Sequence, residues 1–480
     1  MDGATVNNRA LPLSAPEPAA GQRKIFNWFG RTLPQSFFES LKRDLKIVEN
    51  SCIFTLPVTI WLMILQRLSQ KGTLATAVSE LVHGNGRDLL EPCKKALENN
   101  ISAGTGAYSQ ARQRVPTDAV RRVAERTFEH LHEIAPWAGL RGRLFVLDGS
   151  SIRLSNTPAL TKVYPPAENQ YGESHWPVMR VAVMHHVVTG LAMAPQFGLD
   201  HQRGPGVDLI LDKLTCASTP VVNGPDAVSE QGLAEALIDR LPALSVLIGD
   251  RNFGTFSVAW RAHSGGHSTL VRLTEQRARR LNGGELTQDS DRKVRWVPSP
   301  EDRRAHPDLP ADAGIEGRLI VSRPEGAQET LYLFTTLEEA AEQVVPLYKE
   351  RWNIETDLRS LKEQVRLHTI PARSPDLVAS ELLIAIAGYN LIRAVMTEAA
   401  QQIDIDPRRL SFSRSREAVH AFARAVAHVE TPEKFEYHWR LLMRSLTQCK
   451  LPKRNRPPAP RVVWPKPHGF PTRKHQGRKI

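Results

Sequence analysis

Apolar residues recur every three to four positions along the first quarter of the chain. The spacing is seen over residues 37–48, 54–68 and 75–82, and it is the period of an α-helix with one buried face. The run His83-Gly84-Asn85-Gly86 then ends the pattern, because Gly and Asn tolerate the left-handed backbone that terminates helices. We predict a helical domain over residues 26–135, whose scattered Lys and Arg fit either a solvated face or a DNA-binding one.

The hydrophobic pattern changes near residue 144. Residues 143–147 and 244–248 are short apolar runs, and each is followed by an Asp that adjoins a Gly, which predicts buried strands ending in turns. Residues 178–188 and 191–197 flank Thr189-Gly190, a hairpin signal. A helix capped by Asp226 or Ser229, a helix from about residue 257 and a strand at 268–273 follow. This order predicts an α/β fold with a mixed sheet.

Residues 275–330 interrupt the alternation. They are polar and rich in turn residues, with strand-like pieces only at 293–297 and 318–321, so we predict a β-rich insertion. Helical patterns resume at residue 337, and Pro375 signals the start of a long helix that runs to about residue 402. The predicted organisation is a flexible leader (1–25), a helical domain (26–135), a core (140–274 and 331–400), the insertion (275–330), a helical region (401–449) and a Pro-rich tail (450–480).

Charge separates the tail from the rest of the chain. Lys and Arg outnumber Asp and Glu by 63 to 51, and all twelve positive charges in excess follow Glu436, the last acidic residue. Residues 1–436 are therefore neutral, and the tail is basic. Such a tail favours a polyanionic partner such as DNA, because each neutralised phosphate releases a counterion; a purely solubilising tail is the alternative.

The cysteines and the apolar segments bear on the cellular compartment. Cys52, Cys93, Cys216 and Cys449 form no CxxC pair, so we expect neither a zinc module nor a disulfide framework, and a reducing cytosol fits best. The N-terminal residues lack the pattern of a secretory signal. The most apolar run, residues 52–65, is shorter than the ~18 residues of a spanning helix. We predict that it is a buried helix in a cytoplasmic protein without membrane contact.

Three acidic residues are candidates for metal chemistry. Asp148 and Asp250 follow strands whose ends gather at one sheet edge, where two carboxylates suit a hard divalent cation; each is otherwise an ordinary turn residue. Glu355 lies in a helical pattern with Tyr348, Arg351 and Lys362, all four within about 60° of helix arc. A solvated face in which Glu355 pairs with a nearby Arg is the alternative.

Tyr348, Arg351, Glu355 and Lys362 have the spacing of the YREK signature. With Asp148 in LDGSS and Asp250 in GDRNF, the chain resembles the bacterial DDE transposases of insertion-sequence family four. The resemblance covers about residues 140–370, and residues 106–116 also look like the N-terminal domain of that family. It implies a ribonuclease-H-like core interrupted by the insertion, in which Asp148, Asp250 and Glu355 hold two Mg²⁺ (or Mn²⁺) ions.

The resemblance also implies a function. Family members bind the terminal inverted repeats of their element, cleave its ends and join the 3′-hydroxyls to target DNA, and we expect a nucleoid-associated homodimer. Tyr348, Arg351, Lys362 and Arg251 would then contact DNA phosphates. Trp296 is a candidate for stacking on a displaced base, with packing inside the insertion as the alternative. The rival interpretations are a non-catalytic DNA-binding repressor and a nuclease of the same fold. We interpret Phe253 and the pair His185-His186 as structural.

Overall fold

The computed structural model describes residues 27–199, 230–323 and 329–452, apart from positions 50, 51, 70, 99, 135, 136, 138, 167, 170, 171, 174, 369 and 430. The predicted leader, the caps Asp226 and Ser229, Cys216 and almost all of the basic tail lie outside these residues.

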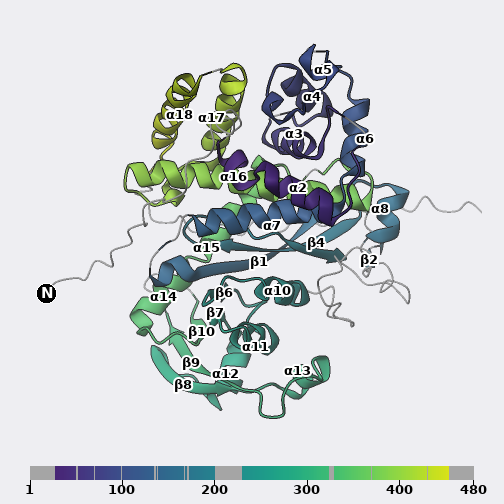
Figure 1. The fold of residues 1–480 in the computed structure, drawn as a ribbon. Coiled ribbons are helices and arrows are strands. Elements are labelled where there is room, and N and C mark those ends of the chain that lie inside the picture. The colour runs from purple at the N-terminus through teal and green to yellow at the C-terminus, as the bar shows by residue number, and fades with distance from the viewer. Residues whose placement is uncertain are drawn as a thin grey trace, which may run out of the picture.

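The chain before the sheet is helical, as predicted. Helix α3 is buried along its whole length, which confirms the predicted buried helix. Figure 1 shows α7 lying along strands β1 and β4. The helices are α1 (Asn27–Thr32), α2 (Gln35–Asp44), α3 (Leu56–Leu68), α4 (Leu74–Val82), α5 (Lys94–Leu97), α6 (Gly106–Arg114) and α7 (Thr117–Glu133).

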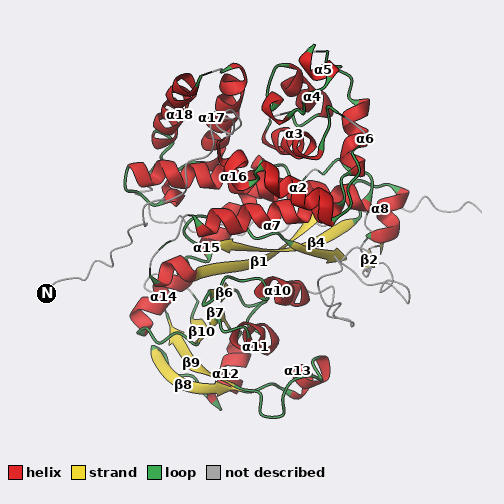
Figure 2. Cartoon of the chain, in the orientation of Figure 1, coloured by secondary structure: helices red, strands yellow, loops and turns green. Residues whose placement is uncertain are grey.

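An eight-stranded mixed sheet follows, which confirms the predicted α/β class (Figure 2). Its strand order is β5-β4-β1-β6-β7-β10-β9-β8; β1, β6 and β7 run parallel, and the other pairings are antiparallel. The strands are β1 (Leu144–Arg153), β4 (Val178–His186), β5 (Gln196–Leu199), β6 (Val246–Gly249), β7 (Ser268–Arg272), β8 (Ser290–Trp296), β9 (Ile315–Ser322) and β10 (Leu331–Thr335). A separate small hairpin pairs β2 (Glu168–Asn169) with β3 (Gly172–Glu173).

Strand β1 is longer than its apolar run. We expected it to end at Asp148, but it continues to Arg153 because β4 pairs with it over residues 145–153. Its parallel pairing with β6 does stop earlier, at Val146 opposite Ile248. Asp148 therefore lies just beyond the parallel part of β1 rather than in a turn.

The segment 275–330 contains the two predicted strands, as β8 and β9, together with helices α12 (Glu275–Asn282) and α13 (Pro300–Ala305). Its strands extend the main sheet, because β9 pairs with β10 and β10 pairs with β7. They lie at the end of the molecule opposite α17 and α18 (Figure 1).

The two faces of the sheet are covered by different helices. Side chains alternate between faces along a strand, and Phe145 and Leu147 join the large core cluster that contains α7 and α10 (Glu230–Ile238). Leu144 and Val146 join a second cluster with α14 (Ala341–Lys349) and α15 (Trp352–Arg359). Even-numbered residues of β1 near Asp148 therefore face α14 and α15.

The remaining helices flank this core. Helix α16 is long and apolar enough to cross a membrane, but its apolar stretch is entirely buried inside the molecule, against α3, α7, α17 and α18. The bounds are α8 (Pro158–Val163), α11 (Phe256–Ser264), the π-helical turn η5 (Ser360–Gln364), α16 (Pro375–Gln402), the 3₁₀ turn η6 (Pro407–Arg409), α17 (Phe412–Ala425) and α18 (Pro432–Thr447).

Candidate active site

Asp148 and Asp250 are neighbours at the ends of the parallel pairing of β1 with β6. That pairing ends at Val146 opposite Ile248. Asp148 lies two residues further along β1, Asp250 directly follows the last residue of β6, and the two carboxylates are close enough for their charges to interact. Val146 and Ile248 both belong to the cluster under α14 and α15, and side-chain alternation directs the two carboxylates toward the same helices. The strands thus place two acids on one face, at the carboxyl end of the parallel part of the sheet.

The electrostatics of Asp148 reflect this pairing. The pKa of Asp148 is raised to about 6, chiefly by burial and also by the neighbouring Asp250 and Glu230, against a backbone hydrogen bond from Gly149 and the charge of Arg351. Asp250 is held in place by its own loop, since its Oδ1 accepts a 2.8 Å hydrogen bond from the Asn252 N–H. Two carboxylates that repel each other in a half-buried position are stabilised by a cation between them.

Arg351 connects these acids with Glu355. Its guanidinium lies 3.7 Å from Glu355 Oε1, and it is also a cationic neighbour of Asp148. Glu355 lies in the first turn of α15 with a side chain that is 39% exposed. The ion pair expected under the alternative interpretation is present, and it lies beside the acids rather than on a remote surface.

The sequence predicts one helix for the four signature residues, but the structure divides this segment into several pieces. Tyr348 lies near the end of α14, Glu355 in α15, and Lys362 in the π-helical turn η5. Between α14 and α15 the N–H groups of Glu350, Arg351, Asn353 and Ile354 bond three residues back, which tightens the chain. Single π-helical turns within helices are frequent at functional sites.

Tyr348 is oriented inward. It is 4% exposed, and burial raises its pKa to about 12, with Asp250 adding to the increase. The ring belongs to the cluster beneath α14 and α15. Its contact with a DNA phosphate therefore stays a prediction, and in this structure Tyr348 packs beside the acids.

The structure adds Glu230, which sequence reasoning missed. Glu230 begins α10, and its Oε2 accepts a hydrogen bond from Asn252 Nδ2, while Gln231 Nε2 donates to Asn252 O and Oδ1 at 2.9 Å. The Glu230 carboxylate packs against the Cα of Gly149, where a Cβ would lie only 2.4 Å from it. Glu230 thus joins the loop after Asp250 to the residue after Asp148. No local pattern signals this contact, because it depends on how α10 packs on the sheet.

The other candidate residues have different surroundings. Trp296 packs against the ring of Phe334, with ring centres 4.8 Å apart, which favours the packing alternative. Arg251 is exposed, and its carbonyl accepts a hydrogen bond from Arg277. Phe253 is buried, as interpreted from the sequence. The histidine pair is buried as well; its contacts are described below.

The donor set suits a hard divalent cation, although it is not gathered into a closed metal site. Within the described residues, no group of three or more His, Cys, Asp or Glu side chains is close enough together to hold a metal ion. The carboxylates of Asp148 and Asp250 nevertheless offer the oxygen ligands that Mg²⁺ prefers, and their mutual repulsion favours a cation. Glu355 reaches the same region through Arg351.

Comparison with known proteins decides the family. A family model described as "Transposase DDE domain" matches residues 209–391. The chain is also 24% identical over 441 residues to the transposase InsG for insertion sequence element IS4 of Escherichia coli (strain K12), and the match covers 88% of each protein. Residues 209–391 therefore form a transposase DDE domain, and the chain along most of its length is similar to an insertion-sequence transposase. The resemblance stated from the sequence is thereby confirmed at the level of the family, whereas the comparisons do not test the YREK signature.

The matched domain identifies the type of fold. The DDE transposase domain is ribonuclease-H-like, and the mixed sheet agrees with it. The matched range includes Asp250 and Glu355 and begins after Asp148. DDE transposases generally depend on divalent metal and act on DNA, and the DDE domain of this chain is of that kind.

Proposed function

We propose that this transposase binds the terminal inverted repeats of its element, cleaves the element ends and joins the 3′-hydroxyls to target DNA. One observation carries the proposal. Asp148 in β1 and Asp250, directly after the parallel strand β6, are neighbouring acids, and the residues that precede them in both strands face the helix that carries Glu355. This arrangement supports phosphodiester chemistry, which needs carboxylates beside a phosphate and no covalent protein nucleophile.

Asp148, Asp250 and Glu355 are the residues that would hold two Mg²⁺ or Mn²⁺ ions. When bound, the ions activate the attacking water or 3′-hydroxyl and stabilise the leaving oxygen. Arg351 lies next to two of the acids, where its charge orients a phosphate and offsets the negative charge that develops on it. Tyr348 is buried beneath this segment.

Lys362 and Arg251 extend the basic lining of the site and contact DNA in this proposal. The hairpin-forming chemistry of the family would need an aromatic surface for a displaced base, for which Trp296 remains the residue we proposed from its type and location. Two element ends are cut in one reaction, so we propose a homodimer that brings them together. None of these DNA contacts is expected of a protein that acts on small molecules.

The test is cleavage of DNA that carries the inverted repeats, with and without Mg²⁺. Replacing the proposed ligand by Glu355→Gln keeps the size of the side chain and removes its charge, and we expect strand cleavage to fall by roughly a hundredfold or more, with repeat binding retained. Glu363→Gln is the matched control, because Glu363 is an exposed acid in the same segment. We expect it to cleave as the wild-type protein does.

The same assay separates the rival functions. A repressor binds the repeats but leaves them uncut with or without Mg²⁺. A nuclease of another kind cuts the DNA and never joins the 3′-hydroxyl to a second duplex. Cleavage that persists unchanged in Glu355→Gln would remove Glu355 from the chemistry.

A further inference from the structure

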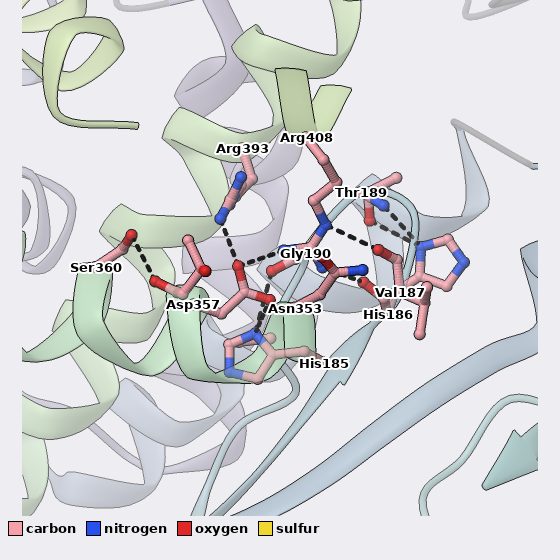
Figure 3. A network of polar contacts seen from close by, with 12 residues as sticks. His185, His186, Val187, Thr189, Gly190, Asn353, Asp357, Ser360, Arg393 and Arg408 are labelled. Atoms are coloured by element: carbon pink, nitrogen blue, oxygen red, sulfur yellow. Dashed lines mark hydrogen bonds and ion pairs between the residues drawn. The ribbon is translucent and has the colours of Figure 1, made fainter. Parts of the chain in front are cut away.

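The helix that carries Glu355 is held by a buried carboxylate two residues away. Asp357 is completely buried, and its Oδ1 accepts hydrogen bonds from both Arg393 and Arg408 (Figure 3). Successive helical residues differ by about 100°, so Asp357 lies on the opposite side of α15 from the half-exposed Glu355. One side of the helix is therefore bonded to the protein, and the other is presented to the site.

The partners of Asp357 come from three different elements. Arg393 lies in α16 and Arg408 in η6, and His185 Nδ1 of β4 lies 3.7 Å from Asp357 Oδ2. Contacts from three directions define both the rotation of α15 about its axis and its position along the sheet. The apolar Ile354 on the same helix packs in the adjacent cluster, but such packing is much less directional than hydrogen bonds.

The same network reaches the strands that carry the other acids. His185 pairs across the sheet with Val146 of β1, two residues before Asp148, and Val146 pairs with Ile248 of β6, two residues before Asp250. Arg408 also donates to the carbonyls of His186 and Val187 at the end of β4. The carboxylate of Asp357 is therefore linked through His185 and the pairing of the sheet to the strands that precede Asp148 and Asp250.

A buried ion pair of this kind contributes little net stability, because the cost of removing the charges from water offsets their attraction. Its value lies in geometry: a carboxylate with two arginines accepts few arrangements, whereas apolar side chains can repack. Helix α15 must hold the Glu355 carboxylate toward those of Asp148 and Asp250. The ion pairs of Asp357 restrict the orientation of this helix, in the way that residues bonded to metal ligands orient those ligands.

We propose that Asp357, through Arg393, Arg408 and His185, is the positioning residue that fixes α15 so that Glu355 faces Asp148 and Asp250. This inference rests on the proposed function of that site. Asp357 itself touches neither DNA nor metal. Its loss is expected to change how much metal the site requires rather than whether the protein binds its DNA.

The experiment compares two buried carboxylates in the full chain. Asp357→Asn removes the charge behind Glu355. Glu381→Gln is the matched control, because Glu381 of α16 is also buried and bonded to two arginines, Arg67 and Arg112, in helices that carry none of the three acids. Both variants lose a buried ion pair, so their melting temperatures show whether the general cost is similar.

We expect Asp357→Asn to raise the Mg²⁺ concentration for half-maximal cleavage by about tenfold or more, as the loss of groups behind metal ligands does. Binding of Mn²⁺ to the complex with repeat DNA, followed by electron paramagnetic resonance, should weaken to the same extent. In Glu381→Gln both values should stay at the wild-type level. Equal metal requirements in the two variants, or an unchanged requirement in Asp357→Asn, would overturn the inference.

Two further arms complete the test. If Asp357→Asn does not fold, Arg408→Lys keeps the charge and removes the forked geometry, and we expect a smaller increase in the same direction; no increase would count against the inference. Wild-type protein and Glu355→Gln are measured in parallel. Mg²⁺-dependent cleavage by the wild type, lost in Glu355→Gln, supports the proposed function whatever Asp357→Asn does, so failure of the inference is distinguishable from failure of the function.

Discussion

At the residue scale, Gly149 shows how one missing side chain organises the site. The carboxylate of Glu230 occupies the space where a Cβ of residue 149 would lie, and it accepts a hydrogen bond from Asn252. Asp148 is directed to one side of β1, toward α15, while Gly149 lets Glu230 approach from the other side. Gly149 therefore leaves space for Glu230, which joins strand β1 beside Asp148 to the loop after Asp250.

Gly149→Ala tests this close approach. The added methyl group would displace the Glu230 carboxylate, which is the far end of a flexible side chain and can move aside at the cost of its hydrogen bond from Asn252. We therefore expect the free energy of unfolding to fall by about 1 kcal/mol at most. Chemical denaturation measures the change. In a Glu230→Ala background the methyl group has room, and the same substitution should cost distinctly less. Equal costs in the two backgrounds would show that Glu230 is not what Gly149 accommodates.

Sequence reasoning at this scale found the acids but not their surroundings. Asp148 and Asp250 could be predicted because each follows an apolar run next to a Gly, a local signal. Glu230 and Asp357 could not, because their roles come from contacts with residues far along the chain, such as Gly149 and Arg393. A buried acid in a helical pattern is indistinguishable from a surface one until its partners are known.

At the element scale, the segment from α14 to η5 departs most from its hydrophobic pattern. The periodicity predicted one helix with four residues on one face, whereas the backbone changes from α-helical bonds to bonds three residues back, and later to the wider π-helical turn. These changes alter the direction of side chains but scarcely alter the spacing of apolar residues. Likewise, the strands β8 and β9 were predictable, but not that they extend the main sheet, since strand pairing is non-local.

Strand β4 carries two histidines on opposite faces, and the second of them, His186, should make the stability of the protein depend on pH. His186 is buried, with Nε2 3.0 Å from the Gly142 carbonyl and Nδ1 2.8 Å from Thr189 Oγ1. Burial, followed by the nearby His132, Arg408 and Arg141, lowers its pKa to about 3. The folded protein thus keeps His186 neutral over a range in which the unfolded chain, with a pKa near 6.5, binds a proton.

The unfolded state therefore binds more protons below pH 6.5, and the free energy of unfolding should fall as the pH decreases. Each pH unit between about 6.5 and 3 costs up to about 1.4 kcal/mol for one such group. His186→Gln loses the buried ring and its two polar contacts, so its stability should be lower at pH 7. It also has no imidazole to take up a proton in the unfolded chain, so its stability should decline less steeply as the pH falls. Urea unfolding at pH 7, 6 and 5 measures both slopes. If the unfolding free energies of the wild type and His186→Gln fell equally steeply with decreasing pH, His186 would not be the group that takes up a proton only on unfolding.

At the scale of the whole molecule, one hydrophobic cluster runs through the N-terminal helices, the sheet and the C-terminal helices. Buried polar contacts cross the same boundaries: Glu381 of α16 bonds Arg67 and Arg112, and Trp28 donates to Glu398. The changes in sequence pattern mark where one kind of element gives way to another, while the core continues across them.

The hydrophobic core extends through the whole molecule, whereas the excess positive charge is concentrated in the basic tail. Residues 453–480 contain nine Lys and Arg and no Asp or Glu, and their deletion leaves a chain with a net charge of 12 − 9 = +3. Each phosphate contact that is lost should reduce the slope of log affinity against log salt by about 0.9 on duplex DNA. We expect the truncated protein to bind repeat DNA more weakly at low salt and with a shallower slope of log affinity against log salt.

The control is a full-length variant in which the nine Lys and Arg residues are changed to Gln. It should match the truncated protein, because it loses the same charge but keeps the length of the chain. A slope that the truncation leaves unaltered would show that the tail makes no contact with DNA and acts only on solubility.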